Sequence, residues 1–599
     1  MSYQRIFTVF VICLFGAVLE LSGQEILSEP EFTDTTKNEK VKLDHSDLAI
    51  IVNKDGREIR YLKNNVAIRQ GDMFMYCDSA TIEDNNVIAV GNVIIQQGDT
   101  LNIFADSLSY QGNVRVADLF GDVRLENNGQ KIFTDQLNYN LESKVASYYT
   151  GATLTNDTTF LVSKRGYYYV RSGQAFFKDS VVVSDPEFTL RSDTLQFSTE
   201  TKIVTFLGPT LINQNETKIY CEGGFYNLDN KYAEFTDNPQ YVKGEQEATG
   251  DKIIYDGTKK EVEIKGSARF DEGEKKASAD IIRYDEANDV TYLEGNAHSE
   301  DGEQVIDSDE IIYDSKNETF KTEGRSRLID GSQILDADTI DFIGNLGVAT
   351  GNVVWTDTTD NINIICERLD YNKETDYVQA SGGRPLMTTL VDEDTMFMSS
   401  DTLVALKENP EDSTRILLGY KDVRIFKSDL QVVCDSLAYN SADSLFEFYQ
   451  SPIIWSDTSQ FFADVIKMQL ANDQIDQIFL IGNAFIINSP DETFYNQIKG
   501  KNITAFFKDN ELDQMDVIGN AESVYYARDE EEAYIGVNKS VCSKMLVYFG
   551  NNEIEYIHFY TQPVSNMLPM KKTNHEDLKL SGFRWEKKLR PKSLEDLLK

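Results

Sequence analysis

The stretch Ala279-Asp280-Ile281-Ile282-Arg283-Tyr284 recurs along the chain at a spacing of 29 residues. Asp251-Lys-Ile-Ile-Tyr255 precedes it, and Asp309-Glu-Ile-Ile-Tyr313 follows it. The position of Asp280, called the acidic slot below, is held at the same step by Asp106, Asp135, Lys164, Asp193, Glu222, Asp338 and Glu367. Self-similarity at a period of this size indicates a repeat architecture rather than a series of unrelated domains.

A second landmark is a glycine that follows the acidic slot by about 15 residues, within the period range of repeat proteins. It stands in Val90-Gly91-Asn92-Val93 and again in Glu294-Gly295-Asn296-Ala297. The segments between landmarks are short, rich in Val, Ile, Tyr and Phe, and bounded by Asn, Asp and Gly turns, which predicts strands. The sequence therefore predicts an all-β, elongated repeat array of about sixteen units of ~29 residues.

The sequence divides into four parts. We expect a signal peptide over residues 1–23, a polar linker over 24–45, the β-repeat array over 46–560 and a basic, aromatic C-terminal tail over 561–599. The chain has 599 residues and a net charge of −41, from 99 acidic against 58 basic side chains. Such a surface repels phosphate backbones and anionic membranes, so we expect no nucleic-acid partner.

The N-terminus has the features of a secretory signal. Arg5 precedes an apolar run from Ile6 to Leu19, and Leu21-Ser22-Gly23 offers small residues for cleavage before Gln24. The run is short for a membrane-spanning helix. We therefore expect a periplasmic protein after signal-peptide cleavage, with outer-membrane association as a further possibility.

Alternation within a repeat predicts one apolar face. In Asp106-Ser-Leu108-Ser-Tyr110 the acid, Leu108 and Tyr110 are expected on one side of a strand, with Ser107 and Ser109 on the other. The wall that such residues form is either a filled core or the lining of a groove. The position before the acid is small and is expected on the opposite face; it holds Cys77, Cys221, Cys366, Cys434 and Cys542. None of these cysteines is in adjacent units, so no disulfide is predicted.

Residues for catalysis or metal binding do not stand out. The four histidines, His45, His298, His558 and His575, are scattered, which disfavours a zinc site or a Ser-His-Asp triad. A ladder of repeated carboxylates could bind divalent cations or act on a polysaccharide. An acid present in every unit is more often structural, and Lys164 occupies the same slot. We predict no catalytic residue, no metal site and no cofactor.

The C-terminal tail differs in composition from the array. It contains Leu580-Ser-Gly-Phe-Arg-Trp585 and Arg590-Pro591, and Ser593–Leu598 is typical of a short capped helix. The tail is expected either to cap the last open strand edge or to dock on the acidic array, a partner or a membrane surface.

Together these motifs resemble a known family. The alternation of a small residue, Asp, Leu or Ile and Tyr with Gly-Asn-Val/Ala is similar to the OstA (organic solvent tolerance) domain of LptA-type periplasmic proteins and of the LptD N-terminal domain. The best local match runs from Gly91-Asn-Val-Ile-Ile-Gln-Gln-Gly98 to Ala105-Asp-Ser-Leu-Ser-Tyr110. The resemblance covers residues 46–560, and the tail resembles the ends of large OstA-like proteins of the Bacteroidetes type.

The resemblance implies a β-jelly roll, V-shaped in section, whose apolar interior shields lipopolysaccharide acyl chains without enzyme activity. It implies an LPS-transport and outer-membrane-assembly role, with partners of the LptD type and inner-membrane transport components joined by strand-edge pairing. On this basis the candidate lipid-lining residues are Leu108, Tyr110, Leu137, Tyr139, Ile282, Tyr284, Ile311 and Tyr313.

Two other functions fit a β-repeat array. A secreted β-solenoid that binds or acts on polysaccharide is expected to carry a non-repeating acidic cluster. A surface adhesin or stalk is expected to carry a sorting domain or a barrel. Neither feature is evident in the sequence, which favours the lipid-carrying bridge.

Overall fold

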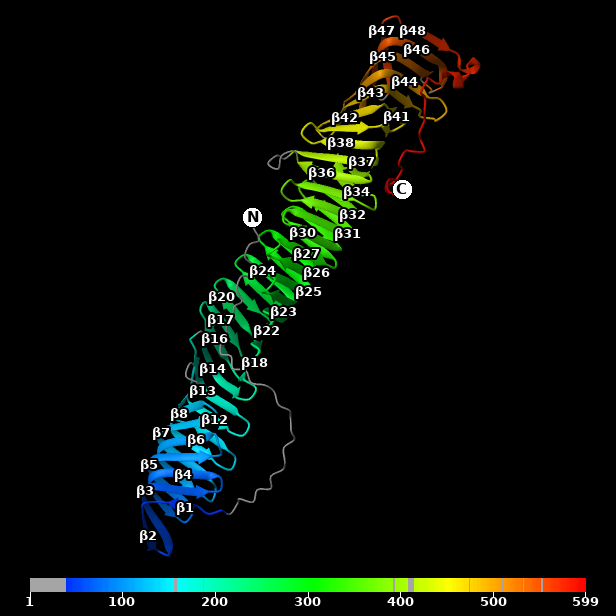
Figure 1. The fold of residues 1–599 in the computed structure, drawn as a ribbon. Helices are drawn as coiled ribbons and strands as arrows, with labels where there is room; N and C mark the ends of the chain where they lie inside the picture. Colours follow the sequence, from blue (N-terminus) through cyan, green and yellow to red (C-terminus); the bar gives the residue numbers. More distant parts are fainter. Residues whose placement is uncertain are drawn as a thin grey trace. The chain divides into compact units, whose positions relative to one another are not determined.

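The computed structural model describes residues 39–155, 159–186, 188–391, 394–407, 414–472, 474–508, 511–529, 531, 533–550 and 553–599. The chain forms two compact units, the first up to Asp301 with Asp314–Lys316, and the second comprising Gly302–Tyr313 with Asn317–Lys599. Each unit is a stack of antiparallel strands (Figure 1). The predicted all-β repeat array is confirmed. The predicted signal peptide and most of the predicted linker lie outside the described residues.

Long strands bend in the middle and contribute to two sheets. In the first unit these are β3 (Arg57–Gln70), β4 (Met73–Glu83), β5 (Asn86–Gln97), β6 (Leu101–Gln111), β7 (Val116–Asn127), β8 (Gln130–Asn140), β13 (Gln174–Ser184), β14 (Thr189–Ser198), β23 (Glu261–Glu272), β24 (Lys275–Asp285) and β25 (Val290–Asp301). In the second unit they are β26 (Gln304–Asp314), β31 (Leu346–Asp357), β32 (Ile362–Asn372), β37 (Arg415–Phe426), β38 (Leu430–Asn440), β43 (Gln474–Asn488), β44 (Asn496–Lys508), β45 (Glu511–Arg528) and β46 (Tyr534–Gly550).

Elsewhere the bend interrupts the strand, and each sheet receives a separate short strand. In the first unit these are β1 (Lys42–His45), β2 (Leu48–Lys54), β9 (Val145–Tyr148), β10 (Ala152–Thr155), β11 (Phe160–Ser163), β12 (Arg165–Tyr169), β15 (Ile203–Phe206), β16 (Thr210–Gln214), β17 (Thr217–Cys221), β18 (Gly223–Asn227), β19 (Tyr232–Thr236), β20 (Gln240–Lys243), β21 (Gln246–Thr249) and β22 (Lys252–Asp256). In the second they are β27 (Thr319–Glu323), β28 (Ser326–Asp330), β29 (Gln333–Ala337), β30 (Thr339–Ile343), β33 (Tyr377–Ser381), β34 (Leu386–Val391), β35 (Asp394–Ser399), β36 (Thr402–Lys407), β39 (Leu445–Tyr449), β40 (Ile453–Ser456), β41 (Ser459–Phe462), β42 (Val465–Ala471), β47 (Glu553–Tyr560) and β48 (Val564–Leu568).

The two sheets within each unit are distinguished by their place in the repeat. Sheet 1 contains the half-strands that follow the glycine and precede the acidic slot, such as Val93–Gln97 of β5 paired with Leu101–Ala105 of β6. Sheet 2 contains the half-strands on the other side of the bend, such as Asn86–Val90 of β5 paired with Ser107–Gln111 of β6. One sequence repeat therefore corresponds to two successive antiparallel strands, each shared between both sheets.

The bend is built by the glycine and the acid. Pairing of β4 with β5 shifts register between Tyr76 and Ser79, where Asp78 lies opposite Gly91 and Asn92. Gly91 and Asn92 have φ of +82° and +46°, a left-handed conformation that glycine and asparagine tolerate best. The Asn92 amide donates to the Asp78 carboxylate at 2.9 Å. The same bond joins Asn296 to Asp280 at 3.1 Å and Asn352 to Asp338 at 2.8 Å.

The predicted alternation of side chains, which placed Asp106 on the same face as Leu108 and Tyr110, is wrong at this bend. Asp106 is exposed, whereas Ala105 before it and Leu108 after it are both buried. The acid thus points away from Leu108 and Tyr110, and the small position faces the interior with them. At the bend the glycine strand has one residue more than the acidic strand, because Gly91 and Asn92 lie opposite Asp106 alone. Period-two alternation therefore fails in the acidic strand, where Ala105 and Leu108, three residues apart, are both buried.

The predicted limits of the array are wrong at both ends. The linker was expected to reach residue 45, but Lys42–His45 form β1 and pair with β3. The tail was expected from 561, but β48 continues the array to Leu568 by pairing with β46.

The rest of the tail does not cap the last strand edge. After the 3₁₀ turns η1 (Met570–Lys572) and η2 (His575–Leu578), it runs back over the outer face of sheet 1 in the second unit. Residues 569–599 are called the strap below. It ends in α1 (Leu594–Leu597); the predicted short helix is confirmed, although its N-cap residue Ser593 makes no side-chain capping bond. No helix of the described residues is long and apolar enough to cross a membrane.

Gly91→Ala tests the role of the bend. A Cβ at Gly91 would lie 2.4 Å from an Asp78 carboxylate oxygen, whereas one at Gly129, with nearly the same φ of +80°, meets nothing within 4 Å. Left-handed strain alone costs about 1 kcal/mol in both variants, and the clash adds about 1–3 kcal/mol at Gly91. Hydrogen exchange is expected to show faster local opening of β4 and β5 in Gly91→Ala than of β7 and β8 in Gly129→Ala. Equal effects would contradict this account.

Candidate functional site

The predicted lining residues lie on the inner face of sheet 2. Seven of the eight are at most 3% exposed: Leu108, Tyr110, Leu137, Tyr139, Ile282, Tyr284 and Ile311. Tyr313 is half-buried. The strands bring them into rows, since Leu108 pairs with Leu119 and Leu119 with Leu137. The interior is therefore filled by side chains from the two sheets.

The opposite wall comes from sheet 1, which the prediction did not include. Val93, Ile95 and Ile103 on β5 and β6 are each at most 1% exposed. The signal for this wall is present in the sequence, because Val93 and Ile95 follow Gly91-Asn92 at alternate positions. The small position before the acid closes the wall near the bend, where Ala105 and Ala279 are buried.

The five cysteines of the described residues are part of this wall. All are buried and unbonded to one another. Burial raises the pKa of the Cys77 thiol to about 11 and that of Cys434 to about 12. These thiols are therefore protonated at neutral pH and act as small apolar side chains.

The interior excludes charge. Asp357 and Lys427 are the only Asp, Glu, Lys or Arg side chains buried among the described residues. Both lie at strand ends rather than in the middle of a wall. Asp357 pairs with Arg415 at 2.8 Å, and Lys427 pairs with Asp429 at 2.8 Å. An uncharged interior of this kind suits apolar ligands, since an unpaired charge inside it would cost several kcal/mol.

The side of the interior opposite the bend, called the mouth below, is closed in the first unit by hydrogen bonds between the sheets. The Tyr110 hydroxyl donates to Gln70, and the Tyr139 hydroxyl donates to Gln97 Oε1 at 2.5 Å. Asn127 donates to the Tyr168 hydroxyl at 2.7 Å. Each bridge joins an inward tyrosine of sheet 2 to an amide at the end of a sheet 1 strand.

Polar bridges also cross the mouth in the second unit, but they are more exposed. Lys373 contacts Asp330 at 2.5 Å, and the Gln333 amide donates to Asp376 at 3.4 Å. Next to them, four half-buried aromatic rings form a ladder with centroid separations of 5.2, 6.1 and 6.3 Å: Tyr313, Phe320, Phe342 and Tyr371. Aromatic side chains in this unit are therefore partly accessible from the mouth, unlike Tyr110 and Tyr139 in the first unit.

The repeated acids are structural groups of the bend. Asp78, Asp280 and Asp338 each accept the neighbouring asparagine amide and are spread along the repeats rather than gathered. Within the described ranges, no group of three or more His, Cys, Asp or Glu side chains is arranged to hold a metal ion.

Comparison with known proteins identifies the OstA domain that the sequence motifs resemble. Residues 38–193 match the family model of the OstA-like proteins, and residues 162–284 and 269–319 match the model described as "LptA/(LptD N-terminal domain) LPS transport protein". Residues 38–319 therefore belong to the OstA-like, lipopolysaccharide-transport family of domains. A comparison with curated proteins finds no significant match for the chain.

Among solved structures, this OstA-like protein is similar to LptH, described as the LptA-homologous periplasmic component of the lipopolysaccharide transport device of Pseudomonas aeruginosa. The two chains are 20% identical, and the match covers 18% of this chain and 82% of LptH, with a TM-score of 0.17.

The mouth bridges were not predicted from the sequence, and docking of the tail on the array was one of several alternatives that the sequence left open. Gln70, Gln97 and Asn127 recur at intervals of 27 and 30 residues, which is a usable signal. It is weak because later repeats of this OstA-like protein place other residue types there. The strap packs on a distant part of the chain, and no local pattern specifies such a contact.

Tyr139→Phe tests the mouth bridges. The substitution keeps the ring but leaves the buried Gln97 oxygen without its donor, which costs about 1–3 kcal/mol. We expect faster hydrogen exchange in β5 and β8. Tyr169→Phe is the control, because Tyr169 is 40% exposed. Identical exchange in both variants would mean that the bridge contributes nothing.

The buried phenols also predict a pH dependence. Burial raises the pKa of Tyr110 from 10 to about 12, so folding favours the neutral phenol. This stabilisation is complete below pH 10 and is lost as the pH rises from 10 to about 12. Tyr110→Phe should flatten the decline in unfolding free energy over this range, measured by denaturant titration at each pH. Tyr61→Phe, at a position 43% exposed, should leave the decline unchanged; the reverse pattern would refute the assignment.

Proposed function

We propose that this protein is a non-enzymatic periplasmic carrier, or bridge, that shields lipopolysaccharide acyl chains between its two sheets. The observation that carries the proposal is the uncharged interior, which is lined by Leu, Ile, Val and Tyr from both sheets in each unit. The two walls recur from one sequence repeat to the next within each unit. An acyl chain would therefore meet equivalent surfaces along the stack of strands in that unit. Leu108, Leu137, Ile282 and Ile311 are proposed to contact the chain.

Lipid entry requires the mouth to open, because side chains of both sheets fill the interior. Burying a chain of about twelve carbons contributes roughly 10 kcal/mol at ~0.8 kcal/mol per methylene. Each neutral hydrogen bond across the mouth contributes about 0.5–1.5 kcal/mol. Opening two or three bridges is therefore compatible with binding. The half-buried ladder from Tyr313 to Tyr371 supports easier opening in the second unit.

The polar part of the lipid is proposed to remain outside. The chain carries a net charge of −41, which disfavours close contact with lipid phosphates. Recognition of the lipid through its acyl chains requires neither a cofactor nor a metal ion. The periplasmic location is proposed from the signal-like N-terminus, with cleavage after residue 23.

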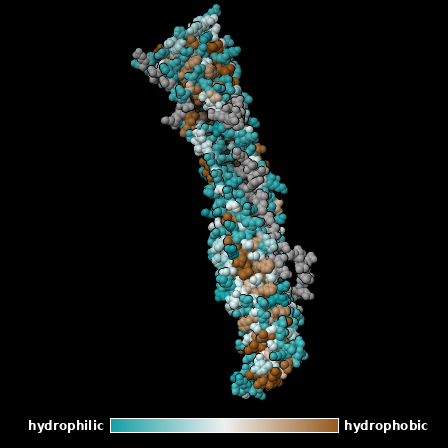
Figure 2. Space-filling view, turned by 90° about the vertical axis from the view of Figure 1, so that its left-hand side faces the viewer, coloured by the Kyte–Doolittle hydropathy of each residue, from teal (hydrophilic) through white to brown (hydrophobic). Residues whose placement is uncertain are grey.

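Exposed strand edges support pairing with other transport proteins. β2 pairs with β3, and on β2 the side chains of Leu48, Ile50, Ile51 and Val52 are 41–62% exposed. Hydrophobic side chains are visible at this N-terminal end, at the foot of Figure 2. At the other end of the chain, Val564 and Met567 of β48 are 60% and 56% exposed. Such edges invite strand addition, here proposed with inner-membrane transport components and an LptD-type partner.

Photo-crosslinking in cells tests the carrier function. A photoreactive amino acid at Ile282 or Ile311, both inward and at most 2% exposed, should give lipopolysaccharide adducts. The matched controls are the adjacent isoleucines Ile281 and Ile312, which point the other way and are half-buried. Adducts at the inward positions alone support the proposal. Adducts at the controls alone, or at none of the four, would overturn it.

A further inference from the structure

The outer face of sheet 1 carries two separate apolar surfaces. The position two residues before the acidic slot points outward from this sheet. It is apolar or aromatic in the first four repeats, mostly polar in the middle and mostly apolar again near the C-terminus. The early residues are Tyr76, Phe104, Phe133 and Val162, the middle ones are Arg191, Tyr220, Thr249, Ser278, Asp307, Asp336, Ile365 and Ser399, and the late ones are Val433, Phe462, Lys499 and Val541.

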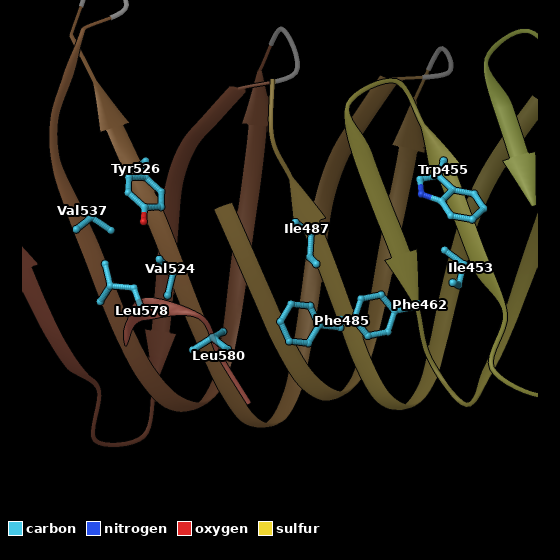
Figure 3. Close-up of a cluster of buried hydrophobic side chains, with 10 residues drawn as sticks. All are labelled: Ile453, Trp455, Phe462, Phe485, Ile487, Val524, Tyr526, Val537, Leu578 and Leu580. Carbon is cyan, nitrogen blue, oxygen red and sulfur yellow. The ribbon is translucent and has the colours of Figure 1, made fainter. Parts of the chain in front are cut away.

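The late surface is covered by the strap. Leu578 and Leu580 pack with Phe462 and Phe485 in one buried cluster (Figure 3). The guanidinium of Arg584 stacks on the Phe462 ring, with 4.5 Å between its central carbon and the ring centroid. The outer positions of these repeats are thus the floor of a site for an extended chain segment.

Glutamines in this floor bind the strap backbone. Gln460 donates to the Arg584 carbonyl and accepts from the Glu586 amide, both at 2.8 Å. Gln497 accepts from the Leu580 amide at 2.8 Å. Both glutamines stand four residues before the acidic slot of their repeat and are at most 2% exposed. This floor therefore binds a peptide through hydrogen bonds to its backbone as well as through apolar packing.

The early surface, called the N-terminal stripe, has the same positions but no covering segment among the described residues. Tyr76, Phe133 and Val162 are 39%, 41% and 46% exposed. A hollow of about 790 Å³ opens here, with Phe104, Phe133 and Val162 in its lining. Exposed apolar surface of this kind on a folded protein marks an interaction site.

Two details of the stripe match the strap-binding floor. Asn102 occupies the position of Gln460 in its repeat and is half-buried, and its side-chain amide has no hydrogen bond to the described part of the chain. Arg124 stacks on Phe104 at 4.4 Å, as Arg584 of the strap stacks on Phe462. The Phe104 ring thus holds a guanidinium of the chain itself, in the way that Phe462 holds that of the strap, and the Asn102 side-chain amide beside it is available to a bound segment.

We propose that the N-terminal stripe docks an extended cationic, aromatic peptide segment of a partner protein. Charge supports this occupant, since three carboxylates, Asp106, Asp122 and Asp135, line the hollow against one cation, Arg124. The chain's own bound segment has this chemistry, because residues 578–592 carry six Lys or Arg and one Glu together with Phe583 and Trp585. The proposal is independent of lipid binding in the interior.

A labelled synthetic peptide with the sequence of residues 578–592 is the probe, and fluorescence anisotropy with the full chain is the measurement. Phe133→Glu places a charge in the centre of the stripe and should weaken binding at least tenfold. Thr249→Glu introduces the same carboxylate at the equivalent, exposed position of a polar repeat and should leave the affinity unchanged. A probe with Ala in place of Phe583 and Trp585 should also bind at least tenfold more weakly.

Three results would overturn the proposal: no binding to the parent chain, equal binding by both variants, or binding that Thr249→Glu weakens as much as Phe133→Glu. Self-association abolished by Phe133→Glu, seen by sedimentation in the absence of peptide, would assign the stripe to a second copy instead. Circular dichroism checks that each variant folds. If Phe133→Glu does not, Val162→Glu replaces it.

Discussion

The structure depends on one constraint, which is that each strand must turn from one sheet into the other without exposing its backbone to the interior. The glycine supplies the left-handed backbone at the turn. The acid, on the outer side of the turn, accepts a hydrogen bond from the side chain of the asparagine that follows the glycine. With the turn fixed in every repeat, the small position and the Leu/Ile and Tyr positions are directed inward. The residue that recurs most clearly in the sequence is therefore the one that does not face the interior.

The 29-residue period specified the strands, their order and the apolar rows, because those features repeat in sequence and in space. It did not specify which face the acid takes. Period-two alternation holds within Leu108-Ser-Tyr110 but fails at Asp106, which lies opposite the two bulge residues Gly91 and Asn92. The wall of sheet 1, with Val93 and Ile95, follows from the same alternation once the bend is known. Docking of the tail on the array was one of the expected alternatives, but the residues in contact could not be predicted, because Gln460 and Arg584 are 124 residues apart and their contact has no local signature.

Inner and outer faces of the sheets serve different purposes on this account. The inner faces are uniform along the repeats, as a surface for chemically uniform acyl chains must be. The outer face of sheet 1 varies from repeat to repeat, with apolar, polar and again apolar stretches. Variation of this kind is what recognition of a particular protein segment requires, and the strap is one segment that the chain already recognises.

We propose that acyl chains enter between the sheets by separating the two sides of the mouth. Asp99 and Ser143 are exposed on opposite sides of it, beside the Gln97 bridges to Tyr139 and Leu141. Spin labels at these two positions allow their separation to be measured by pulsed electron resonance. Intact lipopolysaccharide should lengthen the distance, and its deacylated form should not. Binding of intact lipopolysaccharide with an unchanged distance would contradict the account.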